Sequence, residues 1–316
     1  MKKDSKIFVA GHKGLVGSAI VRTLKERGYT NIITRDRNQV DLTKSNQVEA
    51  FFQEQHWAGT KIDYVFDAAA RVGGIHANDT YSAEFIYENS MIQNNLIHNS
   101  WKYGVNKFIF LGSVCIYPKY ASVPVEESSL LCGELEPTNF AYAIAKIHGI
   151  KMLEAYHKQY GMKSVSLMPC NLYGIGDNFH PDNGHVIPAM FTKFNNSEGK
   201  DVTFWGDGTP KREFMYCEDL ADACLFAAEH FENAELINVG SGENVTINEL
   251  AQTIAGVVRY DGEINWDTTR PNGTPNRPLN SSRIRDLGWK PKHTLAQGLE
   301  KTYQWLIENT YYDSFK

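Results

Sequence analysis

The sequence predicts an α/β protein built on a doubly wound parallel sheet, and three observations support this fold class. Short apolar runs alternate with segments of helical periodicity through the first half of the chain. A glycine-rich turn joins the first apolar run to the first helical segment. After about residue 169, Gly, Asn, Asp and Pro become dense at 170–188 and 270–278, which indicates loops that wrap a ligand.

Each element follows from its local pattern. Residues 6–10 predict the first strand, and the helical spacing after it predicts a helix that ends at Gly28. We expect Asp41 or Thr43 to cap the second helix. The other strands expected in the first half are 31–34, 62–70 and 105–111, and its other helices are 44–55 and 83–103. The helices expected in the second half are 218–229, 247–258 and 295–308.

Composition and charge narrow the class of protein. The chain has 316 residues, is 42% hydrophobic and 22% charged, and contains no apolar run of the ~18 residues that would cross a bilayer. Its net charge of −5 argues against a nucleic-acid surface. The five cysteines form no CxxC pair, and no histidine has metal-ligand spacing. We therefore expect a cytoplasmic protein with reduced thiols, no metal, and neither a membrane nor a nucleic-acid partner.

The glycine-rich turn reads Gly11-x-x-Gly14-x-x-Gly17, after a strand and before a helix. Glycine at these points permits a tight turn, close approach of the backbone to a pyrophosphate, and close packing of helix on strand. The helix N-terminus then offers free N–H groups to phosphates. The turn predicts a Rossmann-like dinucleotide site, with an ordinary glycine turn as the alternative.

The segment after the second expected strand indicates which dinucleotide binds. An NAD site carries an acidic residue there, whereas this chain has Arg35 and Arg37 on either side of Asp36. Two arginines suit a 2′-phosphate, so NADP is favoured over NAD. A solvated surface cluster is the alternative. Asp41 is expected to accept a hydrogen bond from the adenine amine.

Tyr142 and Lys146 are four residues apart, which places both side chains on one helical face. A lysine ammonium beside a phenol lowers its pKa and suits the tyrosine to acid–base chemistry. Ser113 follows the expected strand at 105–111, where its hydroxyl would reach the same carbonyl oxygen. A purely structural helix pair is the alternative for the tyrosine and lysine alone.

The glycine-rich turn, the Tyr142–Lys146 pair and Ser113 together resemble the signature of the extended short-chain dehydrogenase/reductase superfamily. Within it, the chain resembles the GDP-L-fucose synthase family along essentially its whole length. The segments that carry this resemblance are 69–78, 111–119, 136–151, 171–190 and 204–214. It implies a smaller C-terminal α/β substrate domain, so we expect an NADP-binding region mainly at 1–170 and a GDP-sugar-binding region mainly at 171–316, with the chain crossing back.

The resemblance also implies the chemistry. The family epimerises C3 and C5 of GDP-4-keto-6-deoxy-D-mannose and then reduces C4. Ser113, Tyr142 and Lys146 are the implied catalytic triad, and Cys115 and His185 the implied pair that removes and returns protons. Cysteine is a plausible base once its pKa falls, and histidine titrates near neutrality. A buried small hydrophobe and a structural hydrogen-bonder are the alternatives for Cys115 and His185.

Binding residues follow from the same resemblance. The implied cofactor contacts are Gly11, His12, Lys13, Gly14, Leu15, Val16, Gly17, Arg35, Arg37, Asp41, Leu42, Leu111, Gly112, Lys146, Pro169, Asn171, Leu172 and His185. The implied substrate contacts are Lys193, Trp205, Arg212 and Asn272. Bacterial members often carry arginine in place of Lys193 and aspartate in place of Asn272, which leaves the nucleotide contact at Asn272 open. Differences at His76 and Ser82 leave the size of the sugar open.

Three functions remain at this point. The first is an NADPH-dependent epimerase and reductase that makes GDP-L-fucose for cell-surface polysaccharide synthesis. The second is a sister C4-reductase of another GDP-4-keto sugar, such as a heptose, with little or no epimerase activity. The third is a catalytically silent nucleotide sensor on the same fold, against which the intact Ser-Tyr-Lys set argues. The resemblance also implies a homodimer, formed by the helix at 83–103 and the helix of Tyr142.

Overall fold

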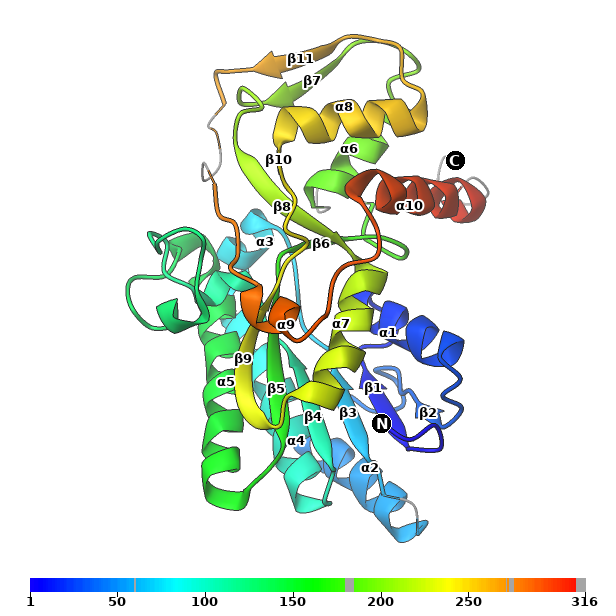
Figure 1. The fold of residues 1–316 in the computed structure, drawn as a ribbon, viewed down its shortest axis with the longest axis vertical. Coiled ribbons are helices and arrows are strands. Elements are labelled where there is room, and N and C mark those ends of the chain that lie inside the picture. Colours follow the sequence, from blue (N-terminus) through cyan, green and yellow to red (C-terminus); the bar gives the residue numbers. More distant parts are fainter. Residues whose placement is uncertain (60, 180–184, 271, 273–275, 311–316) are drawn as a thin grey trace.

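A six-stranded parallel sheet forms the centre of the molecule (Figure 1). The structure is a computed structural model that describes residues 1–316 except 60, 180–184, 271, 273–275 and 311–316. Its inner strands are short apolar runs buried on both faces, as a parallel sheet covered by helices requires. In spatial order the strands are β2 (Ile32–Ile33), β1 (Ile7–Ala10), β3 (Tyr64–Asp67), β4 (Lys107–Leu111), β5 (Ser164–Pro169) and β9 (Asn233–Val239). The predicted fold class is confirmed.

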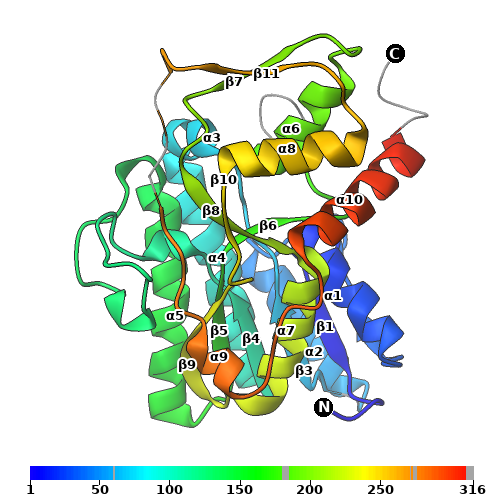
Figure 2. The same cartoon turned by 45° about the horizontal axis from the view of Figure 1, so that its top comes forward.

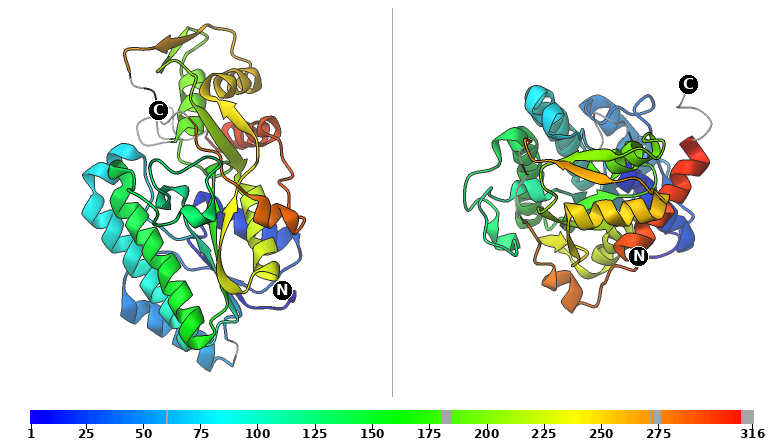
Figure 3. Two further views of the ribbon diagram at one scale, coloured as in Figure 1. Left: turned by 60° about the vertical axis from the view of Figure 1, so that its left-hand side comes forward. Right: turned by 90° about the horizontal axis from the view of Figure 1, so that it is seen from above.

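Helices cover both faces of this sheet (Figure 3). On one face α1 (Leu15–Glu26) packs against α7 (Cys217–His230). On the other face α4 (Ser82–Lys102) packs against α2 (Ser45–Trp57) and, most extensively, against α5 (Phe140–Tyr160). The short helix α3 (Ile75–Thr80) precedes α4.

The second half of the chain adds two small sheets above the carboxyl ends of the central strands (Figures 1 and 2). One consists of β6 (Asn171–Tyr173), β8 (Lys211–Tyr216) and β10 (Asn244–Thr246), and the other of β7 (Val202–Trp205) and β11 (Ile264–Asp267). The helices α6 (Val186–Asn195), α8 (Ile247–Val258) and α10 (Leu295–Thr310) pack around them, and α9 (Ser282–Asp286) lies against β9. Short 3-10 turns occur at η1 (Val114–Ile116), η2 (Glu127–Ser129) and η3 (Pro137–Asn139).

Some strand bounds, one helix cap and one region expected to be loop differ from what the sequence predicts. The strands expected at 31–34 and 62–70 are shorter in the structure: β2 covers only Ile32–Ile33, and β3 covers Tyr64–Asp67 and ends level with Ala10, the last residue of β1. Helix α2 begins with Lys44 at its N-cap and has no side-chain cap, so the expected cap is wrong. The region 170–188 is not all loop, since it contains β6 and the start of α6. Strand β9 comes from the second half yet completes the central sheet; the division near residue 170 stays a prediction.

The described residues contain neither a helix that could span a membrane nor a cluster of side chains that could hold a metal ion. In this part of the chain no helix combines the length and apolarity that a membrane span requires. No three His, Cys, Asp or Glu side chains gather there in a way that would hold a metal ion. The five cysteines are free thiols, and four of them are buried.

The α4–α5 contact predicts a stability difference between two glycine substitutions. A Cβ at Gly149 of α5 would overlap Oε1 of Gln93 and lie 2.8 Å from Cζ of Phe110. We expect Gly149→Ala to lower the free energy of unfolding by about 1–3 kcal/mol, because the core must overpack. Gly256→Ala in α8 meets open space, and we expect it to raise that free energy by up to about 1 kcal/mol. Urea unfolding measures both, and a neutral Gly149→Ala would contradict a tight α4–α5 interface.

Candidate active site

The glycine turn brings the backbone of β1, β3 and α1 into close contact. Gly11 has a φ of +74°, and a Cβ there would lie 2.5 Å from the carbonyl oxygen of Ala68 just after β3. A Cβ at Gly17 would overlap the carbonyl oxygen of Gly11. Gly14 is the N-cap of α1, and no side chain caps that helix. The first turn of α1 therefore presents N–H groups that no side chain covers, which suits a phosphate.

The implied cofactor contacts lie at the carboxyl ends of the central strands. The turn at 11–17 follows β1, Leu111 ends β4 with Gly112 directly after it, and Pro169 ends β5. These strands are parallel neighbours, so their carboxyl ends share one edge of the sheet. Asn171 and Leu172 continue into β6, where the Asn171 amide donates to the carbonyl oxygen of Glu213 at 3.0 Å. A cradle that only glycine can form and an uncapped helix end fit a dinucleotide at this edge.

Charged side chains gather beside the start of α1. Lys13 pairs with Asp36 at 3.2 Å, so the acidic residue between the two arginines is neutralised by a cation of the glycine turn. This hydrogen bond from Lys13 lowers the pKa of Asp36. Arg35 donates to the carbonyl oxygen of Thr34 at 2.9 Å. Burial, followed by the Lys13 charge, lowers the pKa of His12 and favours its neutral imidazole.

Asp41 and Arg37 form a second part of this charged surface. Arg37 lies 3.5 Å from the Asp41 carboxylate, and its side chain remains largely exposed. The other carboxylate oxygen of Asp41 accepts hydrogen bonds from the backbone and hydroxyl of Thr43. Asp41 thus anchors its own loop, next to Leu42, whose carbonyl oxygen accepts a hydrogen bond from Asn95 of α4 at 2.8 Å.

The structure brings together four of the five predicted catalytic residues. Lys146 is 2% exposed, donates to the carbonyl oxygen of Leu111 at 2.8 Å, and has its ammonium 5.8 Å from the centre of the Tyr142 ring. Ser113 is the N-cap of η1, and its hydroxyl accepts a hydrogen bond from the backbone N–H of Cys115 at 3.4 Å. Cys115 interacts electrostatically with both Tyr142 and Lys146. The cluster joins α5 to the end of β4.

Two expectations about ionisation are wrong in this structure. Burial raises the pKa of Cys115 to about 11, although Ser113, Lys146 and Arg277 act in the opposite direction. Burial also raises the pKa of Tyr142, and the nearby Cys115 and a further carboxylate, Asp67, add to that rise. Desolvation therefore outweighs the charge of Lys146 at Cys115 and is the largest effect at Tyr142, and both groups are protonated at neutral pH.

His185 lies apart from the contacts of this cluster. It is the exposed N-cap of α6, and its electrostatic partner in the described part of the chain is Asp177. Burial raises the pKa of Asp177, while the His185 charge opposes that rise. Among the described residues, the structure forms no contact between His185 and Cys115, so their pairing stays a prediction.

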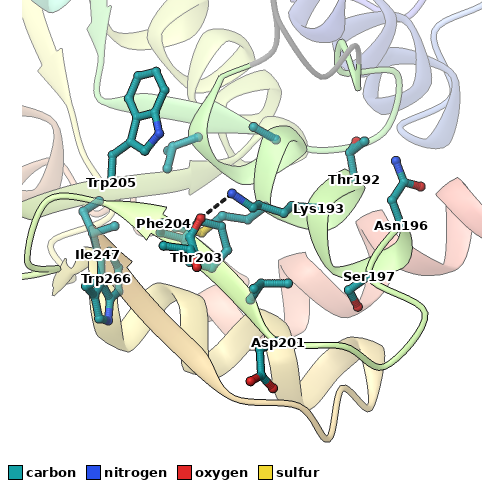
Figure 4. Close-up of a pocket in the computed structure, with 14 residues that line it drawn as sticks. Thr192, Lys193, Asn196, Ser197, Asp201, Thr203, Phe204, Trp205, Ile247 and Trp266 are labelled. Carbon is teal, nitrogen blue, oxygen red and sulfur yellow. Dashed lines mark hydrogen bonds between the residues drawn. The ribbon is translucent and has the colours of Figure 1, made fainter. Parts of the chain in front are cut away.

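Two of the predicted substrate residues line one pocket of about 820 Å³ (Figure 4). Lys193 projects from α6 and donates to the carbonyl oxygen of Thr203, with its ammonium 5.2 Å from the centre of the Phe204 ring. Trp205 is 70% exposed at the end of β7, and the Arg270 guanidinium lies 5.2 Å from the centre of its ring. The volume and the mostly apolar wall are typical of a small-molecule site.

Arg212 and Asn272 are not among the residues that line that pocket. Arg212 is half-buried on β8 and donates to the carbonyl oxygen of Lys211 at 2.7 Å. Burial, and then the charge of Arg277, lower its pKa. Asn272 accepts a hydrogen bond at 3.1 Å from the backbone N–H of Asp207, in the loop after Trp205. Its amide therefore shapes a loop next to the pocket.

Sequence reasoning missed two charged residues of the site. Asp67 ends β3 and is fully buried beside the Tyr142–Lys146 pair. An acidic residue at the end of an apolar strand was the available signal. Arg277 donates to the carbonyl oxygens of Tyr117 and Pro118, both at 2.9 Å, and its charge acts on Cys115. No sequence pattern points to Arg277, because it lies far along the chain.

Comparison with known proteins agrees with this geometry. The model of the NAD dependent epimerase/dehydratase family matches residues 7–240. The chain is 51% identical over 310 residues to GDP-L-fucose synthase 1 of Arabidopsis thaliana, covering 97% of this chain and 94% of that protein. A GDP-6-OMe-4-keto-L-xylo-heptose reductase from C. jejuni has a TM-score of 0.90 at 34% identity, covering 98% and 99% of the chains. A GDP-L-fucose synthetase from Naegleria fowleri bound to NADP has a TM-score of 0.91 at 26% identity, covering 99% and 95%.

Asp67 predicts a specific dependence of stability on pH. Burial raises its pKa to about 6, with the Lys146 charge opposing that rise. The folded state therefore holds the Asp67 proton more tightly than the unfolded state, where the pKa is about 4. This contribution to stability is full below pH ~4 and is lost as the pH rises through ~6; it amounts to about 3 kcal/mol.

The Asp67→Asn variant isolates this pH-dependent contribution to stability, because asparagine does not ionise. We expect the unfolding free energy of the wild type, minus that of Asp67→Asn, to fall between pH 4 and pH 7 in urea unfolding series. A difference that is constant over this range would contradict the raised pKa.

Proposed function

Because this chain belongs to the NAD dependent epimerase/dehydratase family, we propose that it is an NADPH-dependent oxidoreductase that converts GDP-4-keto-6-deoxy-D-mannose to GDP-L-fucose. The observation that carries this proposal is the 51% identity to a GDP-L-fucose synthase over nearly both full chains. The pair formed by half-buried Tyr142 and buried Lys146, beside Ser113 and Cys115, supports it independently. The mostly apolar pocket at Lys193 and Trp205 supports a nucleotide-sugar substrate.

The cofactor site follows from the edge of the central sheet. The turn at 11–17 would hold the pyrophosphate, and Arg35 with Arg37 would hold the 2′-phosphate. When bound, NADPH supplies the hydride for C4 of the sugar. The NADP-bound relative from Naegleria fowleri supports this choice of cofactor.

Tyr142 is the proton donor for the C4 oxygen. Its raised pKa keeps the phenol protonated at neutral pH, which a reduction requires. When the proton leaves, the buried ammonium of Lys146 stabilises the phenolate. The hydroxyl of Ser113 lies at the same strand end and orients the carbonyl oxygen.

Epimerisation requires proton removal at C3 and C5, which the C4 ketone acidifies. Cys115 would act as one proton carrier and His185 as the other. The charges of Lys146 and Arg277 favour the Cys115 thiolate, although burial dominates in the structure. The thiol must therefore lose its proton before it serves as a base.

The second half of the chain would bind the GDP part of the substrate. Lys193 and Arg212 would neutralise the diphosphate, and Trp205 would provide a flat apolar wall. Asn272 would support the loop beside Trp205.

A second candidate function is C4 reduction of a GDP-4-keto-heptose. The similarity in fold to the C. jejuni heptose reductase favours it, at a lower identity than that of the fucose synthase. Both readings use Ser113, Tyr142 and Lys146, so only product analysis separates them.

We also propose that the enzyme is a cytoplasmic homodimer. The paired helices α4 and α5 carry a cluster of aromatic rings, with half-buried Trp101 and exposed Tyr160 stacked at 4.3 Å between ring centres and half-buried Tyr156 next to both. Aromatic side chains of this kind are enriched at protein interfaces. The free thiols fit a reducing compartment.

The choice of cofactor predicts a selective effect of Arg35. We expect Arg35→Ala to raise the KM for NADPH about tenfold or more, because a charge-assisted hydrogen bond to the 2′-phosphate is lost. The KM for NADH serves as the internal control and should change little. Steady-state kinetics with both cofactors measure this, and equal effects on both would contradict the assignment.

Product analysis in deuterated water tests the proposed function. With GDP-4-keto-6-deoxy-D-mannose and NADPH, we expect wild type to form GDP-L-fucose with deuterium at C3 and C5. In Cys115→Ser, deuterium incorporation should fall at least a hundredfold, because a hydroxyl hardly ionises at neutral pH. Cys132→Ser changes an exposed thiol and is the matched control.

The outcomes separate the two candidate functions. Reduction of the heptose substrate without deuterium exchange would support the second. Exchange that is equally fast in wild type and Cys115→Ser would place the base elsewhere.

A further inference from the structure

Asp67 is a buried carboxylate for which the mechanism above has no use. It is the last residue of β3, level with Ala10 of β1 and Phe110 of β4 in the sheet. It is 0% exposed. One carboxylate oxygen accepts a hydrogen bond from the backbone N–H of Ala69 at 3.2 Å. Among the described residues, the other oxygen is buried without any hydrogen-bond partner.

The charged partner of Asp67 is Lys146. The lysine ammonium donates to the carbonyl oxygen of Leu111 and lies 4.7 Å from the centre of the Phe110 ring. Phe110 is the direct neighbour of Asp67 across the β3–β4 pair. The two charged side chains form no direct hydrogen bond in the described structure, so they attract each other through the buried edge of the sheet. Such an environment screens charge far less than water does.

The groups around Asp67 show how its negative charge acts on the protonation of Lys146 and Tyr142. Lys146 and Tyr142 of α5 both interact with it electrostatically, and Cys115 of η1 interacts with those two. The residues level with it on β1 and β4 are apolar. A negative charge at this point favours the protonated form of both α5 side chains, against the burial that favours a neutral lysine.

We propose that Asp67 is a positioning residue for the reduction: its carboxylate holds Lys146 as the ammonium and Tyr142 as the phenol, the forms that proton donation to the sugar requires. This inference rests on the proposed reduction for its role in catalysis. It extends the Ser113–Tyr142–Lys146 set by a carboxylate from the neighbouring strand.

Two variants of Asp67 test the proposal. Both remove the negative charge, but they replace the carboxylate by side chains of different polarity. Asp67→Asn keeps the size of the side chain, and Asp67→Leu replaces it by an apolar one. Asp63→Asn is the control, because Asp63 is a carboxylate near the other end of β3 that bonds to the backbone N–H of Lys6. The measurement is kcat/KM for reduction of the GDP-4-keto sugar as a function of pH.

We expect the high-pH limb of this profile to move down by about one pH unit in both Asp67 variants. Between pH 7 and pH 9, kcat/KM of the Asp67 variants should then decrease roughly tenfold more than kcat/KM of the wild type. Asp63→Asn should keep the wild-type limb. A uniform loss of rate with an unchanged limb would mean that Asp67 only fills space, and it would overturn the proposal.

A second measurement needs no turnover. Phenolate absorbance is titrated in the protein alone, with and without Tyr142→Phe, and the difference isolates Tyr142. We expect the Tyr142 phenolate to form at lower pH in Asp67→Asn than in wild type. If this shift occurs but no GDP-4-keto sugar is reduced, the proposed function fails while the electrostatic role of Asp67 stands. If reduction occurs and neither profile shifts, the role of Asp67 is wrong.

Discussion

The buried ammonium of Lys146 is the constraint on which the catalytic cluster depends. An unpaired charge in a protein interior is costly, so every group around it must compensate. The carbonyl oxygen of Leu111 accepts one of its protons, the Phe110 ring lies beneath it, and Asp67 supplies the opposite charge. These three groups belong to β3 and β4. Helix α5 must therefore dock on this part of the sheet, and its position places Tyr142 over the same edge.

Features that depend on neighbouring residues were predictable from the sequence. The turn at 11–17 needs only a strand, three glycines and a helix in succession, and all of these are local. The spacing of Tyr142 and Lys146 needs only a helix, and α5 provides it. Helix α8 matches its predicted bounds because a capping box at Thr246 and Glu249 marks its start.

Features that depend on distant partners were not predictable in this way. Strand β8 exists because it lies between β6 and β10, which come from different parts of the chain. The raised pKa of Cys115 follows from its burial where η1 packs against α5, and no local pattern reports burial of that kind. Arg277 reaches the carbonyl oxygens of Tyr117 and Pro118 from 160 and 159 residues further along the chain. The same separation hid Asp67, whose partner Lys146 lies on α5, beyond α3, α4, β4 and the three 3-10 turns.

The position of β9 bears on how the protein is made. Strand β5 leaves the ribosome early, but β9, which pairs with it from Ser164 to Pro169, follows only after β6, α6, β7, β8 and α7. During synthesis the nascent sheet therefore carries an open edge of apolar strand, the kind of surface that attracts other chains. A chain released before Val239 would keep that edge permanently. Translation to the end of β9 thus separates an aggregation-prone intermediate from the complete six-stranded sheet.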